Sequence, residues 1–215
     1  MSTLKVDLIS GFTTDLVTID GKVAEGLNTT ASGIASHAEG RNTTAIGDYS
    51  HAEGGFSTSN GNYSHAEGTN TISNGQSSHA EGDGTSATGA VSHAEGIVTT
   101  ASGVGSHAEG SYTIASGPQS HAEGSYTTAS GAYSHASGNI TIASGDGSFV
   151  HGYNSTASGT NTIVLGNNIN GTVSNMVYMS ATEFTDINGI IMRSPNGTRY
   201  RVTVLNDGTL STSPA

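Results

Sequence analysis

Small, polar and apolar positions recur every 14 residues along most of this chain. The unit SHAEG first occurs at residues 36–40, and its histidine returns at a constant interval of 14 residues from His37 to His135. With the serine of SHAEG as position 1, positions 5 and 12 are Gly, position 3 is Ala until Val150, position 8 is Ser or Thr, and position 10 is Ala or Ser. A strict internal period predicts a repeat architecture in which each unit packs against its neighbours.

The frame extends beyond the SHAEG units in both directions. Residues 22–35 form a unit in register, with Val23 and Glu25 at positions 2 and 4. Residues 148–161 form another, with Phe149 and His151 at these positions, and residues 162–166 begin one more. We therefore expect ten complete coils over residues 22–161 and part of an eleventh.

The residue types at each position predict which way each position faces. Positions 3, 8 and 10 carry small side chains and are expected to point inward, between two facing strands of a narrow roll. Positions 2 and 4 then point outward on one strand, and positions 9 and 11 on the other. Positions 6, 7, 13 and 14 vary freely and are predicted to be solvent-facing turns. The two glycine positions indicate tight corners that need a positive φ or a close approach of backbones.

Composition supports a solenoid and excludes several other classes of protein. The 215 residues include 31 glycines and no tryptophan, and only 33% of them are hydrophobic. This is too little apolar material for an ordinary globular core, although only 11% of the residues are charged. The absence of cysteine excludes disulfides and thiol catalysis. A net charge of −11 disfavours a nucleic-acid partner. The opening MSTLKVDLIS lacks the pattern of a signal peptide, so we expect neither secretion nor membrane insertion.

Positions 2 and 4 are predicted to be covered by other copies of the chain. Large apolar residues occupy these positions near both ends of the repeat, and an open solvent face would not favour them. Because no other part of the chain is large enough to cover ten coils, a closed ring of copies is the simplest cover. The predicted interface residues are Val23, Glu25, His37, Glu39, His51, Glu53, His65, Glu67, His79, Glu81, His93, Glu95, His107, Glu109, His121, Glu123, His135, Phe149, His151, Ile163 and Leu165.

The combination of SHAEG and TTASG in 14-residue units resembles the YadA-like head repeat of trimeric adhesins, from residue 22 to about residue 170. The typical unit of that family reads SVAIG, and this chain has TIVLG at residues 162–166 but His and Glu in most other units. The resemblance implies an all-β, left-handed parallel β-roll that forms a homotrimer, with positions 2 and 4 at the subunit interface.

The two ends of the chain resemble flanking segments of bacteriophage tail-fibre and virion-fibre proteins that carry similar repeats. We expect residues 1–21 to be an attachment segment or cap, residues 22–175 the shaft, and residues 176–215 a small β cap at the tip. In this cap the strands IIMR and RYRVTVL are predicted to be joined through Pro195, Asn196 and Gly197, with a second turn at residues 206–208.

The repeated His and Glu have three chemical interpretations. Structural pairing of His with Glu is the one we expect, because a pair repeated in most coils is a rule of construction, whereas an active site is normally unique. Rings of His and Glu around an axis that hold an ion or a metal are the alternative, and catalysis is not expected. We predict no cofactor and no metal ligands.

Structural pairing has a consequence for pH. If each Glu accepts a hydrogen bond from a neighbouring His in the trimer, the pKa of His should rise and the pKa of Glu should fall. Stability should then be greatest in mildly acidic solution.

Two groups of residues are candidates for contact with a host surface. Arg193, Arg199 and Arg201 lie in the predicted cap, and three copies would gather them around the axis. Tyrosines in the turn positions are candidates for stacking on sugars, although exposed turn tyrosines are often inert. These tyrosines are Tyr112, Tyr126 and Tyr133, with Tyr49 and Tyr63 in equivalent positions.

The sequence therefore predicts a structural, homotrimeric fibre or spike of a virus particle of the phage type, which aids attachment to the host surface. It would be synthesised in the host cytoplasm and located in the virion, bound through its N-terminal segment to a capsid or tail protein. A bacterial surface adhesin head that binds host matrix or glycans is the alternative. A self-cleaving tail endopeptidase is less favoured, because the segment after residue 170 shows no convincing pair of nucleophile and base.

Overall fold

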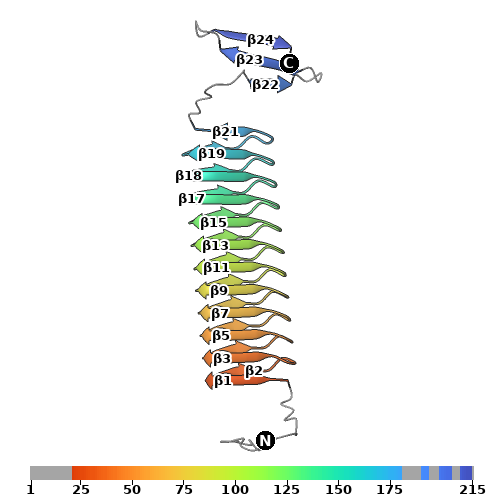
Figure 1. Ribbon diagram of the computed structural model, residues 1–215, viewed down its shortest axis with the longest axis vertical. Helices are drawn as coiled ribbons and strands as arrows, with labels where there is room; N and C mark the ends of the chain where they lie inside the picture. The colour runs from red at the N-terminus through yellow and green to blue at the C-terminus, as the bar shows by residue number, and fades with distance from the viewer. Residues whose placement is uncertain (1–20, 181–189, 194–198, 205–208, 215) are drawn as a thin grey trace, which may run out of the picture. The chain divides into compact units, whose positions relative to one another are not determined.

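The computed structural model describes residues 21–180, 190–193, 199–204 and 209–214, which belong to two units divided after Ser180. The first unit is a parallel β-solenoid in which each coil is one 14-residue sequence unit (Figure 1). Each coil has one longer strand and one short strand, and each strand pairs with its equivalents in the coils before and after. The predicted all-β parallel solenoid with 14-residue coils is therefore confirmed.

The strand bounds follow the repeat. The five-residue strands are β1 Val23–Leu27, β3 His37–Arg41, β5 His51–Gly55, β7 His65–Thr69, β9 His79–Asp83, β11 His93–Ile97, β13 His107–Ser111, β15 His121–Ser125 and β19 Ile163–Asn167. The two-residue strands are β2 Thr30–Ala31, β4 Thr44–Ala45, β6 Thr58–Ser59, β8 Ile72–Ser73, β10 Ser86–Ala87, β12 Thr100–Ala101, β14 Ile114–Ala115, β16 Thr128–Ala129 and β20 Asn170–Gly171. In two coils both strands merge into one, as β17 His135–Ala143 and β18 Phe149–Ala157, and the last strand is β21 Val177–Met179.

Two stacks of glycine backbone hold successive coils in register. At position 5, a Cβ on Gly68 would collide with the carbonyl oxygen of Gly82 in the next coil, and the φ of Gly68 is +109°. At position 12, a Cβ on Gly75 would collide with the carbonyl oxygen of Gly89, although φ is unexceptional there. Both predicted roles of glycine are thus present, a positive φ at position 5 and close backbone approach at both positions.

The interior of the solenoid is built from small side chains, as predicted. Ala80 and Ala87 represent positions 3 and 10, and both are fully buried, as is Thr85 at position 8. The serine at position 1 is also buried, and its hydroxyl usually donates to a carbonyl within the coil, as Ser50 Oγ does to the oxygen of Gly47 at 2.6 Å. The roll is so narrow that most of its buried side chains are no larger than those of Val and Thr.

The corners of the coils have a left-handed conformation, and most of them are not glycine. Every seventh residue from Gly21 to Asn175 has φ between 48° and 68°, which corresponds to positions 7 and 14 of each coil. Tyr49, Phe56 and Val91 are among them, although aromatic and β-branched residues rarely adopt this conformation. The amide of each corner bonds to the coil before it, as Tyr49 N–H does to the carbonyl of Ile34 at 2.7 Å. The sequence predicted turns here. Gly and Asn at some corners, such as Gly84 and Asn70, are typical of the left-handed conformation, but the residue types at the other corners do not indicate it.

The repeat continues further than the sequence motifs indicated. β20 completes the eleventh coil, and β21 starts another, with Val177 paired to Ile163. Tyr178 takes position 3, where other coils have Ala or Val, and packs against the end of the interior. A Cβ on Gly171 would lie 2.8 Å from the Tyr178 ring, so glycine at this position makes room for it. Tyr178 therefore fills the C-terminal end of the narrow core.

The second unit, which begins at Ala181, contains a small antiparallel sheet of β22 Ile190–Arg193, β23 Arg199–Val204 and β24 Leu210–Pro214. The predicted strands of the C-terminal segment are confirmed. The predicted turns at residues 195–197 and 206–208 lie outside the described residues, as does the predicted attachment segment up to residue 20.

We expect Gly75→Ala to destabilise the solenoid by at least about 3 kcal/mol, because a methyl group inserted between two packed backbones must push the coils apart. Chemical unfolding followed by circular dichroism measures the free energy of unfolding of the variant and the parent. Gly55→Ala is the matched control, because nothing lies within 4 Å of its added Cβ and its φ is ordinary. It should be neutral or more stable by up to about 1 kcal/mol. Equal stability of the two variants would contradict the role of the glycine stack.

Candidate functional site

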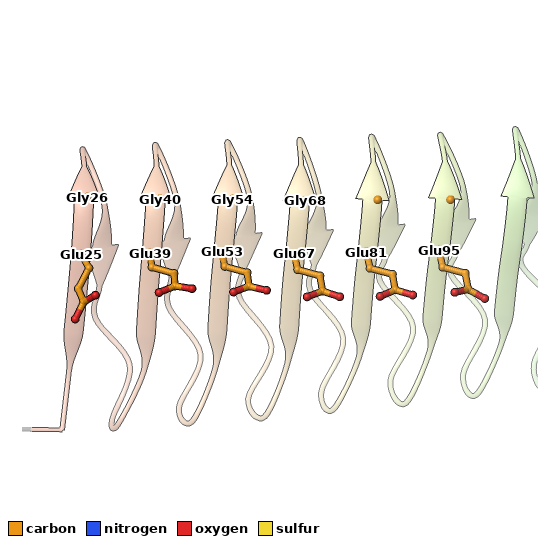
Figure 2. A pocket seen from close by; sticks show the side chains of 12 residues that line it. Glu25, Gly26, Glu39, Gly40, Glu53, Gly54, Glu67, Gly68, Glu81 and Glu95 are labelled. Carbon is orange, nitrogen blue, oxygen red and sulfur yellow. The ribbon is translucent and has the colours of Figure 1, made fainter.

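The histidines at position 2 and the glutamates at position 4 form one continuous row of side chains, here called the His–Glu ladder, from Glu25 to His135. The pleat of each long strand directs positions 2 and 4 to the same face, away from the interior. Parallel pairing then places each residue beside its equivalent, as His79 beside His93 and Glu81 beside Glu95. Figure 2 shows the glutamates from Glu25 to Glu95 in this row, one from each coil.

The imidazole rings of the ladder are stacked face to face. Successive ring centroids lie 4.8 Å apart between His37 and His51 and 4.9 Å apart between His65 and His79, with interplanar angles of 5° and 0°. The stack ends where the ring of Phe149 meets His135 edge-on at 83°. The spacing is that of hydrogen-bonded strands, so the backbone pairing sets the distance between rings.

Nε2 of each ladder histidine lies within 4.0 Å of at least one carboxylate, and Nε2 of His65 and of His79 lies between two. His79 Nε2 is 3.7 Å from Glu67 Oε1 in the preceding coil and 3.9 Å from Glu81 Oε2 in its own coil. Toward the C-terminal end the inter-coil distance shortens, and His135 Nε2 is hydrogen-bonded to Glu123 Oε1 at 3.3 Å. The sequence predicted this pairing of His with Glu, but the pair is tight enough for a hydrogen bond at one end only.

The other ladder nitrogens remain without a hydrogen bond. Within the part of the chain that the structure describes, Nε2 of each histidine from His37 to His121 is shielded from solvent and has no hydrogen-bond partner. The side chains as a whole are about one-third exposed, for example 36% at His79. A buried nitrogen without a hydrogen-bond partner is unfavourable, so most histidines of the ladder have an unsatisfied polar atom.

The glutamates border an open groove with a volume of about 900 Å³. Its walls are the carboxylates of position 4 and the adjacent backbone of the position 5 glycines (Figure 2). Because glycine has no side chain, nothing fills the space beside each carboxylate. The groove therefore presents a line of carboxylates to whatever lies against this face.

Stacking of like groups splits the pKa values of the glutamates. Hydrogen bonds with Glu81 and Glu53, reinforced by burial, raise the pKa of Glu67 to about 7. Hydrogen bonding with Glu81, together with burial, raises the pKa of Glu95 to about 7 as well. The pKa of Glu53 and of Glu81 is lowered, because each accepts hydrogen bonds from the glutamates on either side. Lowered and raised pKa values thus alternate from Glu53 to Glu95, since ionising two carboxyls in adjacent coils is costly.

The histidines do not follow the expected rise in pKa. Burial lowers the pKa of His65, His93 and His107, and the stacked imidazoles beside them lower it further. Nearby glutamates act in the opposite direction, but their effect is smaller. The expectation considered only the attraction between Glu and His, and it omitted the cost of charging a ring that lies 4.8 Å from a like ring.

The ladder gives way to an apolar patch on the C-terminal coils. Ile163 and Leu165 follow Phe149 and His151 at positions 2 and 4, as predicted, and both are 38% exposed. Val177 and Met179 continue the same two rows and are 54% and 46% exposed. Sequence reasoning missed these two residues, because the glycine and SHAEG signals had ended, although a continued 14-residue count would have placed them.

His151 differs from the other histidines. It stands at position 4, and its Nδ1 lies 2.8 Å from Ser137 Oγ, which replaces the glutamate of the preceding coil. The shift of His from position 2 to position 4 therefore comes with its own hydroxyl partner and marks the end of the ladder.

The predicted receptor-contact residues lie elsewhere. Tyr112 and Tyr126 stack on each other at 4.9 Å on one edge of the solenoid, and both are exposed. Tyr133 is exposed at position 14, the corner at the opposite edge, which Tyr49 and Tyr63 also occupy. In the second unit, Arg193 on β22 lies opposite Arg199 on the neighbouring strand β23, and Arg199 is exposed. Arg201 on β23 lies opposite Ile191 on β22. The tyrosines thus lie at the corners of the solenoid and outside the ladder.

Comparison with known families gives one match. The family model described as the YadA head domain repeat, in two copies, matches residues 24–50, 38–64, 66–92, 94–120, 108–134 and 143–168, which together cover more than half of the chain. A search of curated proteins found no match. Within the described ranges, the structure contains no helix with the length and apolar character needed to cross a membrane.

We expect Glu67→Gln to protect the solenoid against loss of stability between about pH 4.5 and pH 7. A carboxyl whose pKa is raised from 4.5 to about 7 contributes stability that is complete below pH 4.5 and lost as the pH rises through about 7. Glutamine stays neutral, so the variant should melt close to the parent at pH 4 and above it at pH 8.

The groups that face Glu67 are Glu53, Glu81, His65 and His79, and they are the same in parent and variant. Histidines with a lowered pKa contribute stability that is lost as the pH falls below 6.5, and this contribution cancels in the comparison. Asp83→Asn removes one carboxylate outside the ladder and should leave the pH profile unchanged. A Glu67→Gln profile parallel to that of the parent would contradict the raised pKa of Glu67.

Proposed function

Because the chain belongs to the family of YadA head domain repeats, we propose that it is a structural, homotrimeric fibre or spike protein of a virus particle of the phage type that aids attachment to the host surface. The family is typical of the heads of trimeric adhesins and fibres. The finer assignment rests on the exposed face of the solenoid and on the segments that flank the repeat.

The observation that carries the trimer is the apolar patch on the C-terminal coils. Ile163, Leu165, Val177 and Met179 lie in two parallel rows on the face that also carries the His–Glu ladder. Large side chains that are 38% to 54% exposed in contiguous rows favour a partner surface. Two further copies of the chain supply the matching patch, because rotation about an axis along the solenoid brings equivalent rows together.

The ladder fits the same interface. Its side chains are about one-third exposed, and partner chains would cover the rest. The raised pKa of Glu67 and of Glu95 reduces the charge that such an interface must accommodate. The ladder is therefore compatible with the predicted homotrimer despite its polar character.

The viral assignment is supported by the flanking segments, which resemble those of bacteriophage fibres. In this proposal residues 1–21 bind a capsid or tail protein, and the C-terminal segment with Arg193, Arg199 and Arg201 faces the host. Exposed Tyr112, Tyr126 and Tyr133 are second candidates for contact with a host glycan or protein. The protein would then reside in the virion after synthesis in the host cytoplasm.

A bacterial surface adhesin head is the second candidate function, and the match to the YadA head repeat favours it as much as a viral fibre. In that case the exposed tyrosines along the solenoid would be the candidates for contact with host matrix or glycans.

We expect the parent protein to have three times the chain mass of 21.5 kDa in light scattering. Leu165→Glu places a charge in the proposed interface, so its trimer should dissociate at a protein concentration at least about tenfold higher than that of the parent. Val104→Glu adds the same charge at an exposed turn outside the interface and should remain trimeric. A parent of 21.5 kDa, or equal dissociation of both variants, would contradict the assigned interface.

Location is tested by electron microscopy with gold-labelled antibodies against the chain. Label on fibres or spikes of purified particles is the expected result. Label on the bacterial envelope, with none on particles, would replace the viral assignment with the adhesin head.

A further inference from the structure

The spaces between successive coils of the His–Glu ladder have the composition of metal sites. We propose that the ladder binds divalent transition-metal cations, best represented by Zn²⁺, each held by one histidine and two glutamates from adjacent coils of a single chain. Five successive groups of this kind are Glu25–His37–Glu39, Glu39–His51–Glu53, Glu53–His65–Glu67, Glu67–His79–Glu81 and Glu81–His93–Glu95, and two more follow the same pattern.

The distances within each group suit a single ion. The ligand atoms of a group all lie within 4.8 Å of one another. His79 Nε2 lies 3.7 Å and 3.9 Å from its two carboxylate oxygens, and His107 Nε2 lies 3.5 Å from Glu95 Oε1. Ligands about 2.1 Å from a tetrahedral Zn²⁺ are separated by about 3.4 Å. The observed separations are too long for charge-assisted hydrogen bonds of about 2.8 Å, but they need only small side-chain rotations to surround an ion.

The orphaned histidine nitrogens provide an independent observation. From His37 to His121, Nε2 is the ring atom that points between the carboxylates, and within the described chain it is shielded from solvent and unpartnered. A neutral nitrogen with a free lone pair is the form of histidine that binds a metal.

The choice of metal follows from the ligands. One imidazole with two carboxylates suits Zn²⁺ and its neighbours in the first transition row, whereas Mg²⁺ and Ca²⁺ prefer oxygen ligands alone. Three protein ligands leave a fourth position of a tetrahedral ion open toward the groove.

The sharing of carboxylates limits the number of ions. In the middle coils, Glu53, Glu67 and Glu81 each place one oxygen near the histidine of their own coil and the other near that of the next coil. Neighbouring groups therefore share a glutamate. Ions in every second group would share none, and each would be neutralised by two carboxylates. We expect about one cation for every two coils.

The test uses the full chain and Zn²⁺ alone, at pH 7.5. Calorimetric titration should show saturable binding at about one Zn²⁺ per two coils. X-ray absorption should show a first shell of nitrogen and oxygen with the scattering pattern of imidazole. The melting temperature should rise with Zn²⁺, and excess Mg²⁺ should not displace the ion. Because each group lies within one chain, the result does not depend on trimer formation.

Two substitutions on the same strand separate specific from general binding. Glu81→Gln removes a carboxylate that belongs to two groups, so it should lower the number of bound ions and reduce the thermal stabilisation by Zn²⁺. Asp83→Asn, two residues away on β9, removes the same charge outside the ladder and should bind as the parent does. Circular dichroism establishes that both variants keep the solenoid fold.

Three results would overturn the proposal. They are an equal number of ions in the Glu81→Gln variant and the parent, a first shell without imidazole, and displacement of Zn²⁺ by equimolar Mg²⁺.

Discussion

The close contact of glycine backbones between successive coils is the constraint on which the rest of the structure depends. At positions 5 and 12 a carbonyl oxygen of the next coil occupies the space that a Cβ would need, as between Gly75 and Gly89. Neither stack tolerates a change in the number of residues per coil, because an added or missing residue would place a side chain in this contact. The period of 14 residues and the parallel register of every strand pair follow from it.

Fixed register means that each side chain lies beside its equivalent, which is favourable for some residues and costly for others. Asn60 Nδ2 donates to Asn74 Oδ1 at 2.7 Å, and the imidazoles stack without strain. Glutamate cannot repeat in this way while fully ionised. The alternating pKa values and the carboxylate contacts of each His Nε2 are two responses to the same crowding. The chemistry of the groove is thus a consequence of the fold.

Much of the fold could be predicted, because it depends on features that a sequence displays directly. Small residues at positions 3, 8 and 10 and glycine at two positions indicated the inside and the contacts of the coils. The left-handed corners could not be predicted throughout, since residues as different as Tyr49, Ser77 and Val91 occupy them. Backbone hydrogen bonds to the preceding coil impose the conformation on any residue there. The candidate site was predicted in its composition and its pairing. The direction in which the histidine pKa shifts was not predicted, because this shift depends on burial and on the distances between neighbouring rings.

The uniform register also makes the coils interchangeable. A coil from Ser64 to Ser77 meets nearly the same neighbours as one from Ser78 to Val91, so loss or gain of a whole unit by unequal recombination within the repeated DNA would create no new packing problem. The length of the solenoid can therefore evolve in steps of one coil, about 4.8 Å each. This freedom ends at Phe149 and Tyr178, whose size suits only the terminal coils.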